Sequence, residues 1–412
     1  MIPQKSFIGA ALGTLIEYYD YALFSTFLPI FAPLFFPANT AYESLHKGYL
    51  IILVTLFFRP LGGLFFGHFG DRFGRRKTLL YSIYGIAIAT ITLGIVPSYA
   101  IWGVWSAIII LTAKAVQIFC FGGEFNGAGI YVMEHSQNKN EVLISSLLTA
   151  TTLFGYLLAS LFGVILTLSF MPDYSWRIAF IFGGVLAFCG IFYRKNFKES
   201  PNFKASSKDD GLIKLIRKFP KEILAGMFVG GFSTVPFTTC AAVLLPILST
   251  KGFISQHEMM LMQTVVAIVA VVALIAVGVL CNGRSPPKIM RISCGLLLVF
   301  SYPALFCIDT YPLLLLPALS ILIFINELFL GPAHAFLKNL FPMQYRYRGT
   351  SFSFCLGMAI FGGVTPIIED HLFQMTQHFS AISIWLILVG IGTYFSISKI
   401  RNVSVVTTVA PA

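Results

Sequence analysis

The sequence predicts an all-α polytopic membrane protein, with twelve transmembrane helices arranged as two pseudo-symmetric halves of six. Three observations predict this fold class: the composition, the number of long apolar segments and the distribution of positive charge. Of the 412 residues, 57% are hydrophobic and 11% are charged, and the mean hydropathy is +0.83. A soluble domain carries about 25% charged residues, so this chain is expected to have the lipid bilayer as its solvent.

Twelve apolar segments follow one another along the chain, and each is long enough to cross a bilayer. About 20 helical residues span a hydrocarbon core of about 30 Å. The seventh segment contains Gly230, Gly231 and Pro236, so we expect a kinked or broken helix there. The expected segments are 7–35, 48–69, 78–97, 101–131, 142–170, 177–193, 220–249, 257–281, 289–307, 311–340, 350–370 and 379–398.

The distribution of Lys and Arg predicts the orientation of the chain in the membrane. With the N-terminus placed in the cytoplasm, 23 of the 28 Lys and Arg residues fall on that side, three fall on the other, and two lie within segments. Cytoplasmic loops of membrane proteins carry an excess of these residues. We therefore expect both termini in the cytoplasm. Topology accounts for the net charge of +11 without nucleic-acid binding.

A polar stretch at 194–219 divides the chain near its midpoint and predicts two halves. A weak repeat supports the division, because Gly67–Lys77 is echoed by Gly278–Lys288, which keeps the Gly, an Asp/Asn pair and the final Lys. Parallel halves of this kind are typical of transporters, with the substrate site between them near the membrane midplane. The expected units are an N-terminal half 1–194, a cytoplasmic linker 195–219, a C-terminal half 220–398 and a tail 399–412.

The sequence lacks the patterns of the common enzyme and cofactor classes. The seven cysteines occur singly, without a CxxC pair, so neither a zinc site nor a disulfide framework is expected. The glycine-rich stretch 122–129 has no preceding strand and no following Lys-Ser/Thr, which favours close helix packing over nucleotide binding. We expect no enzyme activity, no metal and no cofactor.

Four charged residues lie inside the apolar segments: the acids Glu17 and Asp20, and the bases Arg59 and Lys114. Each charge at the centre of a spanning helix costs about 2.5–3.5 kcal/mol. With a rise of about 1.5 Å per residue, Glu17 lies about 15 Å deep and Arg59 about 16 Å deep, and Lys114 comes out near the same level. The four groups are therefore expected to neutralise one another around a polar cavity. The residues expected beside them are Tyr21, Phe24 and Gln117.

Two interpretations of this buried cluster stay open. In one, it is a structural network that holds the first, second and fourth helices together. In the other, it is a proton and substrate site. Burial favours the protonated form of a carboxylate and a nearby cation favours the ionised form, so a group balanced between them can load and release a proton. On this second interpretation Asp20 carries the proton with Glu17 as its partner, and Arg59 and Lys114 bind a substrate carboxylate. A network without function could be replaced by apolar packing at little loss, which favours the second interpretation.

Further candidates lie in the fourth and tenth segments. Asn326 and Glu327 fall inside the tenth segment, where they are either substrate-site residues or interhelical hydrogen bonders. Glu124 and Glu134 lie toward the cytoplasmic end of the fourth segment, where a gate is expected.

The stretch GHFGDRFGRRKTLL, from Gly67 to Leu80, resembles the motif between helices 2 and 3 of the major facilitator superfamily. More narrowly, the chain resembles the superfamily's metabolite:proton symporter branch, which includes proline/betaine, citrate, 2-oxoglutarate and shikimate transporters. The resemblance covers about residues 7 to 398. Its pieces are Glu17-Tyr-Tyr-Asp20, Phe58-Arg59-Pro-Leu-Gly-Gly63, Lys114-Ala-Val-Gln117, Gly122-Gly-Glu124, Trp176-Arg177, Glu199-Ser-Pro201, Arg346-Tyr-Arg-Gly349 and Phe361-Gly-Gly-Val-Thr-Pro366.

The resemblance implies a proton-coupled symporter that imports a small carboxylate-bearing or zwitterionic metabolite by rocking of the two halves. It departs from the branch at Ile118, where a Gly is usual, and at Asn282 and Pro286-Pro287 in the second loop motif. The cytoplasmic gate that it implies consists of Asp71, Arg72, Arg75, Arg76 and Arg346, with Glu124 and Glu134.

Other functions also stay open. Within transport, the alternative is a proton-driven exporter of drugs or metabolites, and outside it a transport-dead membrane sensor. A channel is disfavoured by the two-half organisation. The expected partners are a small-molecule substrate, protons as the coupling ion and the lipid bilayer, with the protein a monomer in a bacterial inner membrane. The identity of the substrate stays open.

Overall fold

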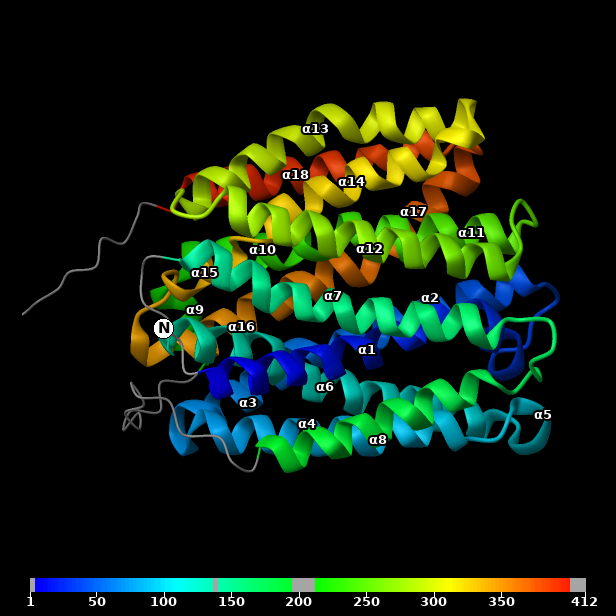
Figure 1. Cartoon of the computed structure of the whole chain (residues 1–412), viewed down its shortest axis with the longest axis horizontal. Coiled ribbons are helices and arrows are strands. Elements are labelled where there is room, and N and C mark those ends of the chain that lie inside the picture. The colour runs from blue at the N-terminus through cyan, green and yellow to red at the C-terminus, as the bar shows by residue number, and fades with distance from the viewer. Residues whose placement is uncertain (1–3, 136–139, 195–211, 401–412) are drawn as a thin grey trace, which may run out of the picture.

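The structure, a computed structural model, describes residues 4–135, 140–194 and 212–400, and every regular element within those ranges is a helix. Figure 1 shows long helices running side by side across the molecule, with α1 beginning and α18 ending at the same end. We call this the terminal end and the other the opposite end. The prediction of an all-α membrane protein is confirmed.

The bounds of the helices give twelve crossings. Ten helical segments in the described residues are long and apolar enough to span a membrane, and α1 and the shorter apolar α8 complete the set. The first part of the chain forms α1 (Gln4–Phe35), α2 (Ala41–Leu56), α3 (Phe58–Phe73), α4 (Arg75–Ile95), α5 (Tyr99–Trp102), α6 (Val104–His135), α7 (Glu141–Leu166) and α8 (Trp176–Arg194). The second part forms α9 (Leu212–Lys218), α10 (Pro220–Thr238), η1 (Thr239–Leu244), α11 (Leu245–Thr250), α12 (Gln256–Leu280), α13 (Pro286–Thr310), η2 (Pro312–Leu314), α14 (Leu315–Leu330), α15 (Ala333–Lys338), η3 (Met343–Tyr345), α16 (Arg346–Gly357), η4 (Met358–Gly362), α17 (Gly363–Thr376), η5 (Phe379–Ile382) and α18 (Ser383–Ser398).

Two crossings contain irregular turns. The seventh has Pro236 near the end of α10, and the π-helical segment η1 follows directly. The eleventh has the π-helical segment η4 shortly before Pro366. A proline lacks the amide hydrogen that a regular helix needs, and π segments mark places where the helical register shifts, often at functional sites.

Several expected boundaries differ from the structure, including the second crossing, which begins at Ala41 rather than at 48. The eleventh crossing continues to Thr376 rather than ending at 370, because the acids near its end are buried and remain within the helix. Part of the expected linker, Leu212–Lys218, is the short helix α9. Residues 195–211 and 401–412 lie outside the described residues, so the division into two halves with a linker and a tail stays a prediction.

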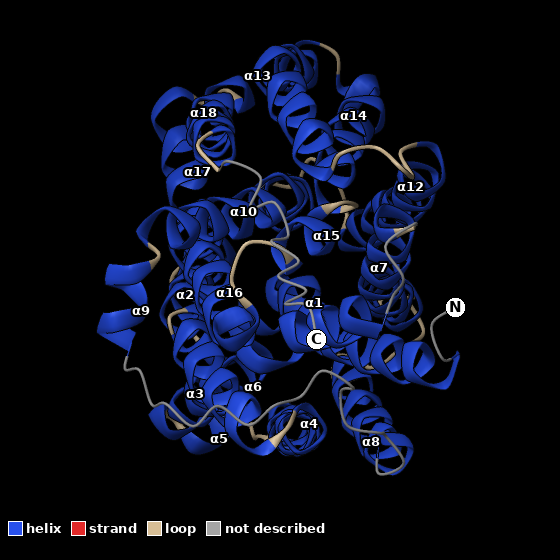
Figure 2. Cartoon of the chain, turned by 90° about the vertical axis from the view of Figure 1, so that its left-hand side faces the viewer, coloured by secondary structure: helices blue, strands red, loops and turns tan. Residues whose placement is uncertain are grey.

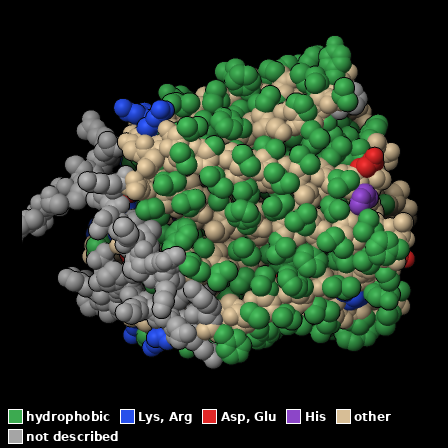
Figure 3. All heavy atoms as spheres, in the orientation of Figure 1, with side chains coloured by type: hydrophobic (Ala, Val, Ile, Leu, Met, Phe, Trp, Pro, Cys, Tyr) green, Lys and Arg blue, Asp and Glu red, His purple; other side chains and the backbone are tan. Residues whose placement is uncertain are grey.

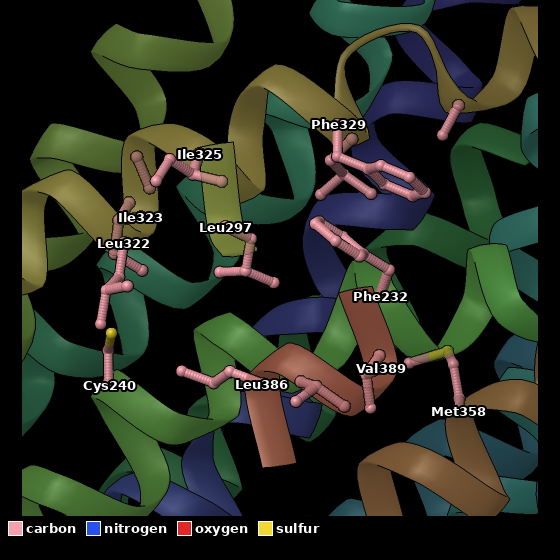
Figure 4. Close-up of a cluster of buried hydrophobic side chains, with 14 of the residues drawn as sticks. Phe232, Cys240, Leu297, Leu322, Ile323, Ile325, Phe329, Met358, Leu386 and Val389 are labelled. Atoms are coloured by element: carbon pink, nitrogen blue, oxygen red, sulfur yellow. The ribbon is translucent and has the colours of Figure 1, made fainter. Parts of the chain in front are cut away.

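The helices pack apolar sides inward and present other apolar sides outward. Large side chains such as Ile88, Val272 and Leu388 are exposed on the flanks, as expected for surfaces that face lipid rather than water. Figure 3 shows hydrophobic side chains covering the flank that it displays, with Lys and Arg near the terminal end and also toward the opposite end. Inside the second part of the chain, Phe232 and Phe329 stack with ring centroids 4.1 Å apart within a large apolar cluster (Figure 4).

The first and second parts of the chain meet along a few helix pairs. Figure 2, seen from the terminal end, places α3, α4 and α8 on one side and α13, α14 and α18 on the other. Between them, α7 packs against α12 and α3 packs against α16. Within the first part, α3 and α6 cross closely at Gly62 and Gly122, where an added side chain would overlap the backbone of the other helix. This crossing brings Arg59 of α3 near the segment of α6 that carries Lys114.

Candidate functional site

A buried ion pair joins α1 to α3. Arg59 donates from its Nη2 to Glu17 Oε1 at 3.0 Å, and both side chains are 1% exposed. Burying either charge alone would cost several kcal/mol, so each group needs a partner of opposite charge at this depth. The expected contact between the first and second segments is therefore present.

A second chain of polar contacts links α6 to α1 through α4. Lys114 Nζ donates to Gln117 Oε1 at 2.7 Å, Gln117 Nε2 donates to Thr90 Oγ1 at 2.7 Å, and Thr90 Oγ1 donates to Asp20 Oδ2 at 2.8 Å. All four side chains are buried. We call Lys114, Gln117, Thr90 and Asp20 the polar relay. Every bond in it is donated toward Asp20, so the relay connects a cation at one end to a carboxylate at the other.

Aromatic rings lie beside both cations. Tyr21 has its ring centroid 5.7 Å from Arg59 Cζ and 5.7 Å from Lys114 Nζ. Phe24 lies 4.7 Å from Lys114 Nζ, and Phe121 lies 5.9 Å from Arg59 Cζ. The faces of aromatic rings carry partial negative charge and stabilise nearby cations, more so when the cations are desolvated. The rings thus help to keep Arg59 and Lys114 charged within the bundle.

A cavity of about 60 Å³ lies beside Tyr21, between the first and second parts of the chain. Typical ligand pockets measure roughly 300–1,000 Å³, so this cavity must widen to hold a metabolite. From the first part of the chain it is lined by Tyr18, Tyr21, Phe125, Thr152, Leu153 and Tyr156. From the second part its lining includes Ser233, Thr234, Phe237, Thr238, Asn326 and Glu327.

Glu327 is the carboxylate of this cavity. The side chain is fully buried, and Oε1 accepts a hydrogen bond from Asn326 Nδ2 at 3.1 Å. Oε2 is buried without a hydrogen-bond partner in the part of the chain that the structure describes. An acceptor left open beside aromatic rings is suited to a donor or a cation brought by a ligand.

The structure assigns the two acids of α1 to different partners. Glu17 bonds to Arg59 of α3, whereas Asp20 bonds to Thr90 of α4 and lies against Gly183 of α8. Lys114, rather than Arg59, is the cation linked to Asp20. Of the substrate residues expected from the sequence, Tyr21, Asn326 and Glu327 line the cavity, while Arg59, Lys114, Gln117 and Phe24 lie outside its lining.

The gate residues expected from the sequence lie in different surroundings. Arg346 Nη1 lies 3.4 Å from Glu134 Oε1 and joins α16 to α6 at the terminal end. Glu124 is buried and accepts from Ser82 Oγ at 2.8 Å, which places it between α4 and α6. Arg72 and Arg76 are exposed, and Arg72 lies over the ring of Phe73. The side chains of Asp71 and Arg75 lie outside the described residues.

Sequence reasoning missed several polar contacts. Thr90 is one of several hydroxyl residues in α4, and nothing in the local pattern marks it as the link between Gln117 and Asp20. At the terminal end, Lys338 Nζ bonds to Glu141 Oε1 at 2.9 Å. At the opposite end, Asp370 of α17 accepts a hydrogen bond from Tyr42 of α2. The side chains that form these contacts are visible in the sequence. Their partners lie far away along the chain, so the sequence did not predict which residues would meet.

Comparison with known proteins identifies the family of this chain. A model of the Major Facilitator Superfamily matches residues 10–366. A putative proline/betaine transporter of Staphylococcus haemolyticus is 28% identical over 414 residues, covering 97% of this chain and 87% of the relative. The inner membrane metabolite transport protein YhjE of Escherichia coli is 28% identical over 408 residues, covering 93% and 90%. The proline/betaine transporter of Escherichia coli is 26% identical over 411 residues, covering 94% and 81%.

Solved structures show the same fold. The proton:xylose symporter XylE superimposes with a TM-score of 0.80 at 15% identity, covering 96% of this chain and 94% of that one. The human organic anion transporter MFSD10 gives a TM-score of 0.73 at 13% identity, covering 96% and 100%. The resemblance that the sequence motifs indicated is thus confirmed, and the expectation that the chain is not an enzyme is confirmed with it. This chain is a membrane transporter that belongs to the Major Facilitator Superfamily.

Proposed function

We propose that this transporter is a proton-coupled symporter, which couples inward movement of protons to uptake of a small zwitterionic or carboxylate-bearing metabolite. The observation that carries the proposal is the polar relay, because it links a carboxylate that can take a proton to a cation that can bind a substrate anion. Both groups are buried at the level of the central cavity.

The relay supplies a physical reason for coupling. Lys114 stabilises the ionised form of Asp20 through Gln117 and Thr90. A substrate carboxylate that pairs with Lys114 withdraws part of that stabilisation, so Asp20 takes up a proton more readily when substrate is bound. Coupling between two sites is reciprocal, so protonation of Asp20 also strengthens substrate binding. Symport requires this mutual dependence.

The cavity supports a zwitterion as the substrate class. Glu327 and the surrounding rings suit a cationic group, while Arg59 and Lys114 lie near the ring of Tyr21, which lines the same cavity, and suit a carboxylate. A molecule with both charges can engage both sides as the cavity widens. The names of two relatives, both proline/betaine transporters, point to the same class.

The proposed orientation places the terminal end in the cytoplasm, because most Lys and Arg residues lie at that end of the expected topology. The proposed location is a bacterial inner membrane, which the name of the relative YhjE also states for that protein. We propose a monomer as the working unit, because both parts that line the central cavity belong to one chain.

Asp20→Asn tests the proposal in proteoliposomes with an imposed pH difference and labelled proline, glycine betaine, citrate, 2-oxoglutarate and shikimate as probes. The neutral amide mimics protonated Asp20, so the variant is expected to lose accumulation against a gradient and to keep exchange of substrate across the membrane. Asp173→Asn, in an exposed turn, is the matched control and should behave as the parent protein. Accumulation by Asp20→Asn equal to that of the parent would exclude Asp20 as the coupling group. Efflux driven by the gradient in the parent protein would show an exporter instead.

A further inference from the structure

Helix α17 carries two consecutive acids, Glu369 and Asp370, within the eleventh crossing, and both are buried. Neither takes part in the polar relay or lines the central cavity. Glu369 faces the π-helical segment η1 of the seventh crossing, and Asp370 faces α2. The pair thus occupies the place where the two irregular crossings approach each other, toward the opposite end of the molecule.

The contacts of Thr239 allow Glu369 to hold a proton. Thr239 Oγ1 lies 2.6 Å from Glu369 Oε1 and 2.9 Å from the carbonyl oxygen of Val235. A hydroxyl has one hydrogen to donate, and a carbonyl oxygen can only accept. If the hydroxyl donates to Val235, the hydrogen between Thr239 and Glu369 must come from the carboxyl group. Glu369 then donates as a neutral acid.

The surroundings of Glu369 agree with a neutral carboxyl group. The side chain is fully buried, Oε2 has no hydrogen-bond partner, and no cation forms an ion pair with it in the described residues. The ionisable groups that face it are Cys240 of η1 and Tyr49 of α2, and neither is a cation. An isolated carboxylate charge in such a place is strongly disfavoured, so the group takes a proton instead.

Asp370 connects this place to the surface. It lines a cavity of about 600 Å³ at the opposite end, and residues of both α2 and α17 form the walls of this cavity. Asp370 accepts from Gln374 Nε2 at 2.8 Å and from Tyr42, and His46 Nδ1 lies 3.0 Å from Oδ2. The His46 side chain is 40% exposed, so the cluster has one wet side. The other charged or titratable groups around the cluster are Glu43, Lys47, Lys251 and His371.

We propose that Glu369 is a second proton-binding carboxylate of this transporter, located in the second part of the chain and loaded from the opposite end through Asp370. Loading breaks an O–H bond of a hydronium ion in the cavity, which leaves as water, and forms an O–H bond on Asp370. That bond then breaks as an O–H bond forms on the ionised Glu369, and Asp370 returns to its carboxylate form. Separation of α2 from α17, which opening of that end requires, breaks the contacts of Asp370 with Tyr42 and His46 and gives water access to the acids.

The binding of a proton by Glu369 does not depend on the proposed symport. The role of that proton in transport does rest on the proposed symport. Thr239 belongs to η1 of the seventh crossing and Glu369 to the eleventh. A shift between these crossings separates the Thr239 hydroxyl from Glu369 and changes the affinity of Glu369 for the proton. A proton in each half, at Asp20 and at Glu369, would then be exchanged as the halves rock.

Infrared spectroscopy of the reconstituted protein tests the proton site without any substrate. A protonated carboxyl C=O band is expected at neutral pH in the parent protein, and part of it should be lost in Glu369→Gln. Glu222→Gln, near the terminal end, is the matched control and should keep the band. Thr239→Val should keep the band but shift its frequency, because one hydrogen bond is removed. An infrared spectrum of Glu369→Gln identical to that of the parent would overturn the proposal.

Two further variants test the route and guard against misfolding. Asp370→Asn should slow replacement of the carboxyl proton by deuterium after transfer to D2O, and unchanged exchange would exclude the route through Asp370. If Glu369→Gln does not fold, Glu369→Asp replaces it in the test. This variant keeps a carboxyl group, so the carboxyl band should persist at a changed frequency. Absence of any carboxyl band change in both Glu369→Asp and Thr239→Val would also overturn the assignment.

Transport with the same probes then tests the role of the site. Glu369→Gln is expected to lower the number of protons that enter per substrate molecule, measured with a pH-sensitive dye inside the liposomes, and to keep substrate exchange. If the parent protein moves substrate without protons, the proposal of symport is wrong. The infrared result still decides whether Glu369 binds a proton. A proton-to-substrate ratio unchanged in Glu369→Gln would exclude a coupling role for Glu369.

Discussion

Among the individual residues of the site, each charged side chain has a different polar partner inside an apolar bundle. Arg59 is held by Glu17, and Lys114 by Gln117 and two rings. Asp20 receives a neutral hydroxyl from Thr90 instead of a cation. The two acids of α1 therefore have different chemistry, although they are only three residues apart.

The Glu17–Arg59 pair predicts a specific pattern of stability. Arg59→Gln is expected to lower the free energy of unfolding by about 3–5 kcal/mol, because the buried carboxylate loses its ion pair. Adding Glu17→Gln to that variant should recover most of the loss, since no buried charge then lacks its cation. Thermal unfolding of the purified protein measures both effects, with Arg284→Gln, at an exposed position, as the control. A double variant less stable than Arg59→Gln would contradict the ion-pair assignment.

At the scale of helices, close packing positions these charges. The crossing of α3 and α6 at Gly62 and Gly122 leaves no room for side chains between the two backbones. Small residues allow such approaches in membrane bundles, where van der Waals packing and hydrogen bonds hold the helices together. Arg59 lies one turn from Gly62, so the depth and direction of its side chain depend on this crossing.

A methyl group at the crossing is therefore expected to disturb the site. Gly62→Ala should destabilise the protein by about 1–3 kcal/mol or more and reduce transport, because the added carbon would overlap the carbonyl oxygen of Phe119. Gly295→Ala, in α13, is a matched control, since nothing lies within 4 Å of the added carbon. Unfolding temperature and uptake rate measure the two outcomes. Equal behaviour of the two variants would show that α3 and α6 can separate without cost.

In the whole molecule, polar contacts join the two parts of the chain at both ends of the bundle. Lys338–Glu141 and Arg346–Glu134 join the two parts of the chain at the terminal end, and the contacts of Asp370 join them at the opposite end. The small central cavity lies between these closures. A carrier that rocks between two open states must break one set of contacts at a time.

The terminal-end pair allows a charge-swap test of this view. Glu141→Lys should favour opening of the terminal end, because Lys338 then faces a like charge, and combining it with Lys338→Glu should restore the original balance. A partly exposed pair contributes about 1 kcal/mol or less, so the expected change in the population ratio is about fivefold or less. Accessibility of single cysteines placed at the two ends measures the ratio. Failure of the double variant to restore accessibility would show that the pair does not hold the end closed.

From the sequence alone, the fold class could be derived and a common depth for the four charges could be predicted. The chain has twelve apolar segments and few charged residues. In a bilayer, segments of this kind satisfy their backbone hydrogen bonds by forming a bundle of spanning helices. Helical rise placed Glu17, Asp20, Arg59 and Lys114 near one level, and the motif around Gly67 to Lys77 indicated the family. These features are local, because hydropathy, length and rise depend only on neighbouring residues.

Only the tertiary structure decided which charges meet. Rotation of each helix about its axis is fixed by packing, so depth alone cannot show that Glu17 turns toward Arg59 while Asp20 turns toward Thr90. The sequence also placed the end of the eleventh segment at 370, which hid Glu369 and Asp370 at an expected boundary. The structure continues the helix to Thr376 and brings Glu369 against Thr239, because contacts between distant crossings, and not hydropathy, determine which side chains are buried together.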